Sequence, residues 1–234
     1  MTSDQPPDVG AIIAAAGRSE RAGEIDKLWA PLVGPDGRSR PLLAYTLDAF
    51  QACPTVGRIV LVVAAGAVER ADALVQSQGF DKVRAVAPGG ARRQDSVRAG
   101  LEALGQCDWV IVHDGARPLV TPDLIERGLA AARETGAACC ALPVTDTVKE
   151  GDDAGRIVRT LDRSRLWLAQ TPQVFRYDLL VEAHRKAQGE ATDDAALVEA
   201  LGVRVRLYEG SPRNIKVTTA EDLALAQALL TATG

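Results

Sequence analysis

Short apolar runs alternate with helical patterns over most of this chain. The runs have the length of buried strands, and between them the apolar residues are spaced nearer 3.6 than 2. This alternation predicts an α/β fold with a mostly parallel sheet and helices on both faces. The expected strands are residues 11–15, 58–63, 83–87, 109–113, 137–142 and 203–208, and the expected helices are residues 41–50, 67–78, 94–104, 122–134, 177–187 and 221–230. Ligands bind at the carboxyl ends of such strands, so polar residues there are the first candidates for a site.

Residues 144–168 interrupt the alternation. They lack a helical period, and the turn-forming stretch at 149–155 is flanked by Thr-Val-Lys and Arg-Ile-Val-Arg-Thr. This pattern predicts a β-hairpin arm that projects from the domain. An exposed hairpin edge is normally covered, so we expect a homodimer formed through the arm, with a flexible surface loop as the alternative.

Length and composition narrow the class of protein. The 234 residues fit one domain, placed at residues 9–234 after a polar segment, 1–8, that is expected to be disordered. A net charge of -4 disfavours nucleic acid or a membrane surface as partner. The absence of an apolar signal or spanning segment predicts a cytoplasmic protein. Cys139 and Cys140 lie in an apolar run and are expected to be buried free thiols.

The segment after the first expected strand combines small residues with cations. It reads Ala14-Ala-Ala-Gly17-Arg-Ser-Glu-Arg21-Ala-Gly-Glu-Ile-Asp-Lys27. Small residues let backbone N–H groups approach a phosphate, and Arg and Lys neutralise its charge. The segment matches neither the Walker A loop nor the dinucleotide fingerprint. Alone, it fits a polyphosphate site or an ordinary strand–helix turn equally well.

Four further polar segments lie at the ends of expected elements. Pro88-Gly-Gly-Ala-Arg-Arg-Gln-Asp-Ser96 opens a helix, where free N–H groups and a hydroxyl can hold a base or ribose. His113-Asp-Gly-Ala-Arg-Pro118 ends a strand with groups suited to ribose, metal or phosphate, although His113 is equally well explained as a core histidine. The segment Thr192-Asp-Asp194, taken alone, is explained as a helix cap. The segment Asn214-Ile-Lys-Val-Thr218, taken alone, is explained by a lysine exposed to solvent.

Together these segments resemble one family from about residue 9 to 229. The motifs are A-A-G-x3-R-x5-K, G-G-x2-R-x-D-S-V, H-D-x-A-R-P, D-T-V-K, D-R-x2-L-W-x-A-Q-T-P-Q-x-F, T-D-D-A and N-I-K-V-T. In this order and spacing the chain resembles the 2-C-methyl-D-erythritol 4-phosphate cytidylyltransferases of the non-mevalonate isoprenoid pathway. The resemblance implies a three-layer, Rossmann-like nucleotidyltransferase fold and a homodimer clasped through the arm. It also implies Mg²⁺-dependent transfer of CMP from CTP, with the substrate phosphate attacking the α-phosphorus in line and pyrophosphate leaving.

The resemblance also implies roles for individual residues. Arg21 and Lys27 are expected to stabilise charge on the phosphorus and the leaving pyrophosphate, Lys216 to lie near the α-phosphate, and Arg163 to orient the attacking phosphate. The implied CTP pocket comprises Ala14, Ala15, Ala16, Gly17, Gly90, Ala91, Ser96 and Asp114. The implied contacts to the sugar phosphate are Asp114, Arg117, Thr147, Arg163, Thr171 and Thr192. No metal ligands are implied.

The chain departs from the family pattern in the first loop. Ala14, Ser19, Ala22 and Asp26 stand where the family usually has Pro, Gly, Met and Pro, and Leu28-Trp29 replaces Gln-Tyr. Because the cationic pair Arg21 and Lys27 is retained, we expect an active enzyme with altered nucleotide affinity. The alternatives are the same transfer to ribitol 5-phosphate, another nucleotidyltransferase of the same superfold, and a CTP-binding regulatory module without turnover.

Overall fold

The computed structural model describes residues 7–17 and 26–232. Within them the main sheet has the strand order β11-β7-β10-β6-β1-β4-β5. The strands are β1 (Val9–Ala15), β4 (Arg58–Val63), β5 (Val83–Pro88), β6 (Trp109–Asp114), β7 (Ala137–Pro143), β10 (Trp167–Arg176) and β11 (Arg206–Glu209). Only β10 is antiparallel to its neighbours. The predicted mostly parallel sheet is therefore confirmed, with the last strand beginning three residues later than expected.

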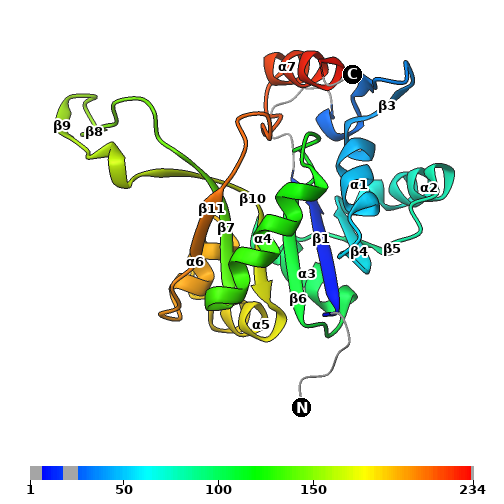
Figure 1. The fold of residues 1–234 in the computed structure, drawn as a ribbon, viewed down its shortest axis with the longest axis horizontal. Coiled ribbons are helices and arrows are strands. Elements are labelled where there is room, and N and C mark those ends of the chain that lie inside the picture. The colour runs from blue at the N-terminus through cyan, green and yellow to red at the C-terminus, as the bar shows by residue number, and fades with distance from the viewer. Residues whose placement is uncertain (1–6, 18–25, 233–234) are drawn as a thin grey trace.

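Helices cover both faces of the sheet and form the three predicted layers (Figure 1). Along β1, Ile13 faces α1, α2 and α4, whereas Ile12 faces α3, α5 and α6, because successive strand residues point to opposite faces. In Figure 1, α7 lies beyond the carboxyl ends of the strands. The helices are α1 (Leu42–Ala52), α2 (Val68–Gln78), α3 (Arg93–Leu104), α4 (Pro122–Thr135), α5 (Tyr177–Lys186), α6 (Asp194–Glu199) and α7 (Ala220–Thr231).

The helix boundaries follow from local sequence signals. The Thr121 hydroxyl accepts a hydrogen bond from the Leu124 N–H at the start of α4, and Pro122 occupies the first helical position. Thr219 caps α7 in the same way, because its hydroxyl accepts from the Asp222 N–H. The helix α4 ends at Gly136, which adopts the left-handed conformation that favours glycine.

Strand β10 is the main element that the sequence did not predict. Its residues were expected to belong partly to the arm and otherwise to no element. The strand contains Pro172, which normally argues against a central strand because proline donates no ladder hydrogen bond. The pairing with β7 shifts register between Ala169 and Gln173, and this irregularity accommodates the proline in the middle of the sheet.

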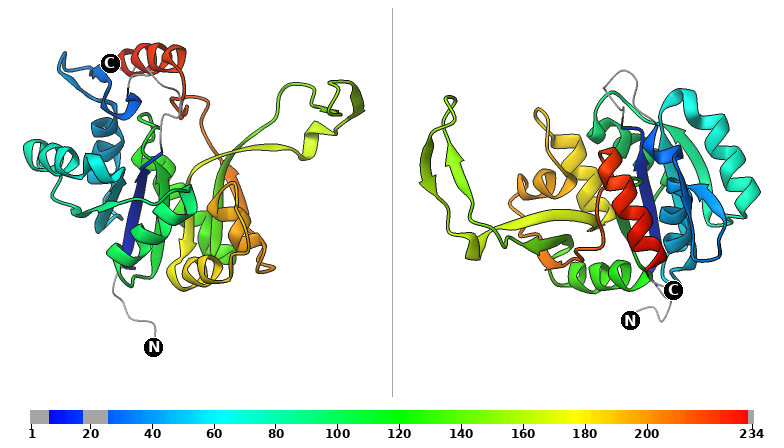
Figure 2. Two further views of the ribbon diagram at one scale, coloured as in Figure 1. Left: turned by 180° about the vertical axis from the view of Figure 1, so that it is seen from behind. Right: turned by 90° about the horizontal axis from the view of Figure 1, so that it is seen from above.

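The predicted hairpin is present and stands clear of the rest of the molecule (Figure 2). Strands β8 (Lys149–Gly151) and β9 (Ile157–Thr160) pair antiparallel, and Ile157 and Val158 are exposed. The 3₁₀ turn η3 (Arg163–Arg165) leads from the arm back to β10. The remaining short elements are the 3₁₀ turns η1 (Lys27–Trp29) and η2 (Ala65–Ala67) and the hairpin of β2 (Pro31–Val33) and β3 (Ser39–Pro41).

The structure also bears on the expectations for the thiols and the N-terminus. Cys139 and Cys140 are buried free thiols, as predicted. Of the N-terminal segment, residues 1–6 lie outside the described residues, and Asp8 forms an ion pair with Arg58 at 2.9 Å. Within the described ranges, no helix combines the length and apolar character required to cross a bilayer.

The close packing of α3 on the sheet gives a first testable prediction. A Cβ at Gly100 would lie 2.5 Å from Cγ2 of Ile12, a fully buried side chain. We expect Gly100→Ala to lower the free energy of unfolding by about 1–2 kcal/mol, because overpacking outweighs the gain in helix propensity. Urea denaturation measures the difference, with the exposed Glu102→Ala on the same helix as the control. A Gly100→Ala protein more stable than the wild type would contradict this packing.

Candidate active site

A cleft of about 510 Å³ lies at the carboxyl ends of β1, β5 and β6. Most of the predicted CTP and charge-stabilising residues meet there although they come from distant parts of the chain. The predicted residues that line it are Ala14, Ala15, Ala16, Gly17, Lys27, Gly90, Ala91, Ser96, Asp114 and Lys216. The cleft is also lined by Asp26, Leu28, Arg92, Arg93, Ala116, Val217 and Thr218. Parallel strands ending at one edge of the sheet bring these segments together.

The floor of the cleft is built from small residues because two loops approach each other closely. A Cβ on Gly89 would clash with the Cβ of Ala16, and one on Gly90 would clash with Asp95. A residue without a side chain at 89 therefore lets the loop lie against the end of β1, and one at 90 lets the loop fold back onto the first turn of α3. Asp95 then closes a capping box with Arg92 at the start of α3.

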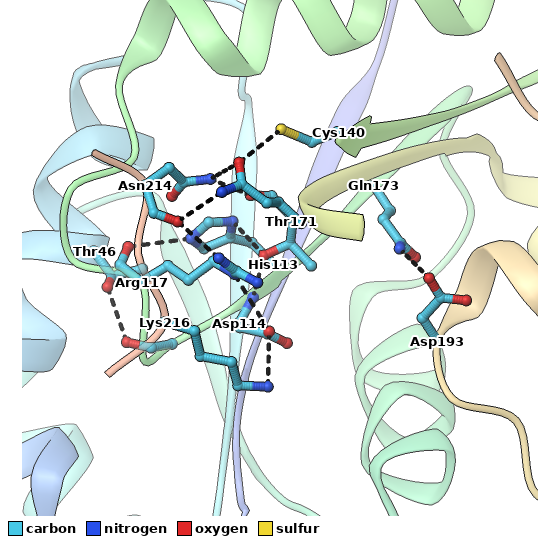
Figure 3. A network of polar contacts seen from close by, with 12 residues as sticks. Thr46, His113, Asp114, Arg117, Cys140, Thr171, Gln173, Asp193, Asn214 and Lys216 are labelled. Atoms are coloured by element: carbon cyan, nitrogen blue, oxygen red, sulfur yellow. Dashed lines mark hydrogen bonds and ion pairs between the residues drawn. The ribbon is translucent and has the colours of Figure 1, made fainter. Parts of the chain in front are cut away.

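Three cationic side chains surround the carboxylate of Asp114 at the end of β6. Lys216 Nζ lies 3.0 Å from Oδ2, Arg117 Nε 3.6 Å from Oδ2, and Arg93 Nε 3.5 Å from Oδ1. Figure 3 shows Lys216 and Arg117 on this carboxylate. Burial disfavours the charged form, but the three cations outweigh it and hold the pKa of Asp114 at about 2. Asp114 is thus an anion at neutral pH, and it orders the cations of the cleft.

His113 and Thr171 form a buried layer beneath Asp114 (Figure 3). The Thr171 hydroxyl accepts from the Asp114 N–H at 3.0 Å and also lies 3.0 Å from His113 Nδ1. His113 Nε2 lies 3.3 Å from the carbonyl oxygen of Arg117, which can only accept. Burial lowers the pKa of His113 to about 3, so the imidazole is neutral; its proton is on Nε2, and Nδ1 accepts from the Thr171 hydroxyl. His113 is a satisfied core histidine, which decides between the two explanations left open by the sequence.

The segment that carries Lys216 is held on both sides. Arg117 Nη1 donates to the carbonyl of Asn214 at 2.7 Å, and the Asn214 amide donates to the carbonyl of Thr171 at the same distance (Figure 3). After Lys216, the N–H of Val217 donates to the carbonyl of Ala116. The lysine therefore projects from a fixed backbone even though it lies in no helix or strand.

Lys27 is positioned by the short turn η1. The Trp29 side chain of this turn is buried, and the Arg70 guanidinium lies 4.3 Å from the centre of its ring. The N–H of Trp29 also donates to the carbonyl of Asp26 at 2.9 Å. Asp26, one of the departures from the family pattern, lies beside Lys27 at the edge of the cleft. Ser19, Ala22 and Arg21 lie outside the described residues.

The other predicted site residues do not line this cleft. Arg117 and Thr171 are buried beneath it and act on Asp114 and Lys216 through the contacts above. Thr147 and Arg163 are exposed at the base of the arm, where Arg163 donates to the carbonyl of Thr145. Thr192 is exposed just before α6. Within one chain, Thr147, Arg163 and Thr192 are thus separated from the CTP residues, whereas Asp114, which is expected to contact both substrates, lines the cleft.

Arg93 and Asn214 are parts of the site to which sequence reasoning gave no role. Both belong to quoted motifs, but a motif does not reveal which of its members point inward. Arg93 begins a helix directly after the carboxyl end of a strand, which is a signal for a ligand-facing residue. Asn214 has no comparable signal, because its function is to join loops that meet only in the folded chain.

The chemistry of the cleft suits a highly charged anion. Lys27, Arg92, Arg93 and Lys216 line it together with only two acids, Asp26 and Asp114, among the described residues. Small residues and backbone N–H groups at the start of α3 complete a surface typical of phosphate sites. Among residues 7–17 and 26–232, no cluster of three or more His, Cys, Asp or Glu could hold a metal ion.

Comparison with known proteins agrees with this geometry. The family model described as IspD, 2-C-methyl-D-erythritol 4-phosphate cytidylyltransferase, matches residues 9–232. The chain belongs to this family. The 2-C-methyl-D-erythritol 4-phosphate cytidylyltransferase of Dehalococcoides mccartyi (strain CBDB1) is 49% identical over 222 residues, which cover 95% of this chain and 96% of the relative.

Solved structures of the cytidylyltransferase family share the fold. The crystal structure of 2-C-methyl-D-erythritol 4-phosphate cytidylyltransferase from Thermus thermophilus is 38% identical, with a TM-score of 0.77 and coverage of 95% of this chain and 98% of that one. The 4-diphosphocytidyl-2C-methyl-D-erythritol synthase of Anaerococcus prevotii is 30% identical, with a TM-score of 0.81 and coverage of 96% of both chains. The predicted α/β nucleotidyltransferase fold is therefore confirmed.

The neutral state of His113 predicts a specific pH dependence of stability. Because its pKa is about 3 in the folded protein and about 6.5 when unfolded, only the unfolded state takes up this proton between these values. Acidification below about pH 6.5 therefore lowers the free energy of unfolding. The stability that the protein has with a neutral His113 is fully present only above about pH 6.5. We expect His113→Asn to remove about 1.4 kcal/mol per pH unit from that slope.

Urea denaturation from about pH 5 to 8 measures the effect of His113→Asn. The slope, and not the absolute stability, is the relevant quantity, because the asparagine also loses the hydrogen bond to the carbonyl of Arg117. Above about pH 7.5 the two proteins should show parallel pH profiles. Parallel profiles below about pH 6 as well would mean that His113 is protonated in the folded state.

Proposed function

We propose that this chain transfers CMP from CTP to 2-C-methyl-D-erythritol 4-phosphate and releases pyrophosphate. The observation that carries the proposal is the convergence of Lys27, Arg93 and Lys216 with the small-residue floor in one cleft of a chain that belongs to this family. The cleft has the charge and the backbone donors that a triphosphate requires. The expected activity agrees with the names of its relatives.

The proposed mechanism depends on position and charge. The phosphate of the acceptor attacks the α-phosphorus of CTP in line, forming one P–O bond while the bond to pyrophosphate breaks. Negative charge grows on the leaving oxygen and the equatorial oxygens, and Lys27, Lys216 and Arg21 are proposed to neutralise it. No covalent enzyme intermediate is required. Asp114 keeps Lys216 extended into the cleft and is proposed to contact the ribose or the acceptor.

Mg²⁺ is proposed to enter with the nucleotide. The residues fit such an ion, because Mg²⁺ commonly uses phosphate oxygens, waters and one or two carboxylates, and the cleft has Asp26 and Asp114 within its lining. The ion would reduce the charge of the triphosphate. The buried carboxylate of Asp114 already has three cationic neighbours, so we propose that phosphate oxygens supply most of the ligands.

The exposed arm is proposed to complete the site of a second copy of the chain. Arg163 and Thr147 lie at the base of an arm that extends away from the body, and exposed Ile157 and Val158 give it an apolar surface to bury (Figure 2). A homodimer with exchanged arms would cover this surface and bring Arg163 to the partner's cleft. We also propose a cytoplasmic location, which agrees with four free thiols.

The first prediction from this proposal concerns the substrate and Lys216. With CTP and Mg²⁺, we expect pyrophosphate release with methylerythritol 4-phosphate and none above background with ribitol 5-phosphate. Lys216→Met should lower kcat on the order of a hundredfold, because charge on the transition state loses its cation. Release with ribitol 5-phosphate alone would move the protein to another polyol phosphate. If the protein binds CTP but releases pyrophosphate with neither acceptor, the result would support a regulatory module instead.

The second prediction tests the exchanged arm by complementation. Arg163→Ala and Lys216→Met should each be nearly inactive alone. In a mixed dimer, the subunit that retains Lys216 receives Arg163 from the other chain, so one of the two sites is intact. Refolding the two variants together at equal concentration should restore about a quarter of the wild-type activity, since about half of the dimers are mixed. No recovery despite verified mixed dimers would mean that Arg163 acts within its own chain.

A further inference from the structure

Arg93 lies between two carboxylates, one at the end of strand β6 and one at the start of helix α6. It is the first residue of α3, and its guanidinium lies 3.5 Å from Asp114 in the cleft and 2.6 Å from Asp194 at the start of α6. The shorter contact is to Asp194, which does not line the cleft. The place of Arg93 in the cleft therefore depends on a residue behind it.

Asp194 is itself fixed from two directions. Its side chain is fully buried, so its charge requires compensation by partners. Oδ2 accepts from Arg93, and Oδ1 lies 3.0 Å from Nε2 of His184 on α5. Burial opposes its ionisation, yet the His184 hydrogen bond and the charge of Arg93 lower the pKa of Asp194. Each carboxylate oxygen thus has one partner.

The helices that carry these residues are also joined to the sheet. The Gln173 amide of β10 donates to Asp193 Oδ2 at 2.7 Å, and its oxygen accepts from the Ala195 N–H at 3.1 Å (Figure 3 shows the contact to Asp193). The start of α6 is therefore anchored on both sides of Asp194. Helix α5 packs against α6, which brings the buried imidazole of His184 onto the carboxylate (Figure 1).

We propose that His184 is a positioning residue that acts on the cleft through Asp194 and Arg93. A carboxylate only accepts hydrogen bonds, so His184 Nε2 must donate, and this bond fixes the plane of the Asp194 carboxylate. Asp194 then holds the Arg93 guanidinium 3.5 Å from the Asp114 carboxylate, so that Lys216, at 3.0 Å, makes the shorter contact to Asp114. Without the His184 bond, Asp194 can turn and Arg93 can move toward Asp114 and compete with Lys216.

The inference rests on the proposed cytidylyl transfer, so the wild-type reaction is measured first. We expect His184→Leu, which has no donor, to lower kcat about tenfold, with a smaller change in the KM for CTP. His184→Gln retains a donor near the position of Nε2 and should remain within about threefold of the wild type. Leu180→Ala, a core truncation on the same helix, should lower the melting temperature without changing kcat per folded molecule.

A double variant tests whether the residues act in series. Asp194→Asn keeps the shape of the side chain but loses its charge. If the Asp194 carboxylate holds Arg93, this variant should also lower kcat. Adding His184→Leu to it should produce no further loss, because the histidine acts through the same carboxylate. If the losses of kcat from the two single variants multiply in the double variant, the inference is contradicted. A His184→Gln protein as slow as His184→Leu would contradict it as well. If His184→Leu does not fold, the Asp194→Asn and His184→Gln proteins still test the positioning role.

The controls separate this inference from the proposed function. If the wild type turns over methylerythritol 4-phosphate and His184→Leu does so equally fast, the proposed function stands and the positioning role is wrong. If the wild type is inactive with this substrate, the proposed function fails. In that case a crystal structure of His184→Leu decides the positioning role, and an Arg93 guanidinium that still contacts Asp194 and lies no closer to Asp114 than 3.5 Å overturns it.

Discussion

Asp114 lies at the carboxyl end of β6 with Lys216, Arg93 and Arg117 around its carboxylate, and the geometry of the cleft depends on these ion pairs. A buried carboxylate is costly unless it is paired, and so are clustered cations without an anion among them. Each therefore stabilises the other. The result is a fixed group of positive charges, set in place before a ligand arrives, which is the arrangement that most effectively stabilises charge developing in a transition state.

The polar layer beneath Asp114 explains how one acid can organise segments so far apart in the sequence. Thr171 of β10 holds the backbone of Asp114, and Asn214 links β10 to the segment of Lys216. The hydrogen bonds here join β6, β10 and the chain before α7, so removing one leaves another buried polar group without a partner. A neutral His113 suits this layer, because a charged imidazole would add a cation where three already share one carboxylate.

Much of this arrangement could be predicted from the sequence, and the remainder has physical causes. Helical and strand periodicity placed the parallel core, and the rule for carboxyl ends correctly gathered Ala14, Gly90 and Asp114. Strand β10 was missed because Pro172 and two glutamines contradict the pattern of a central strand, and tertiary hydrogen bonds override that local signal. Arg93 and Asn214 received no role because their partners lie far away along the chain. The arm that carries Thr147 and Arg163 was predicted correctly, but no local signal in the sequence indicates which cleft these two residues serve.

The most direct test of this account is the pKa of the Asp114 carboxyl in the folded protein. A ¹³C NMR titration of the aspartate side chains, with the signal assigned by its loss in Asp114→Asn, measures it. We expect a value of about 2, because the three cations outweigh the cost of burial. A value of about 4 or above, the ordinary range of an aspartate, would mean that the cations do not converge on this carboxylate, and the proposed organisation of the cleft would be wrong.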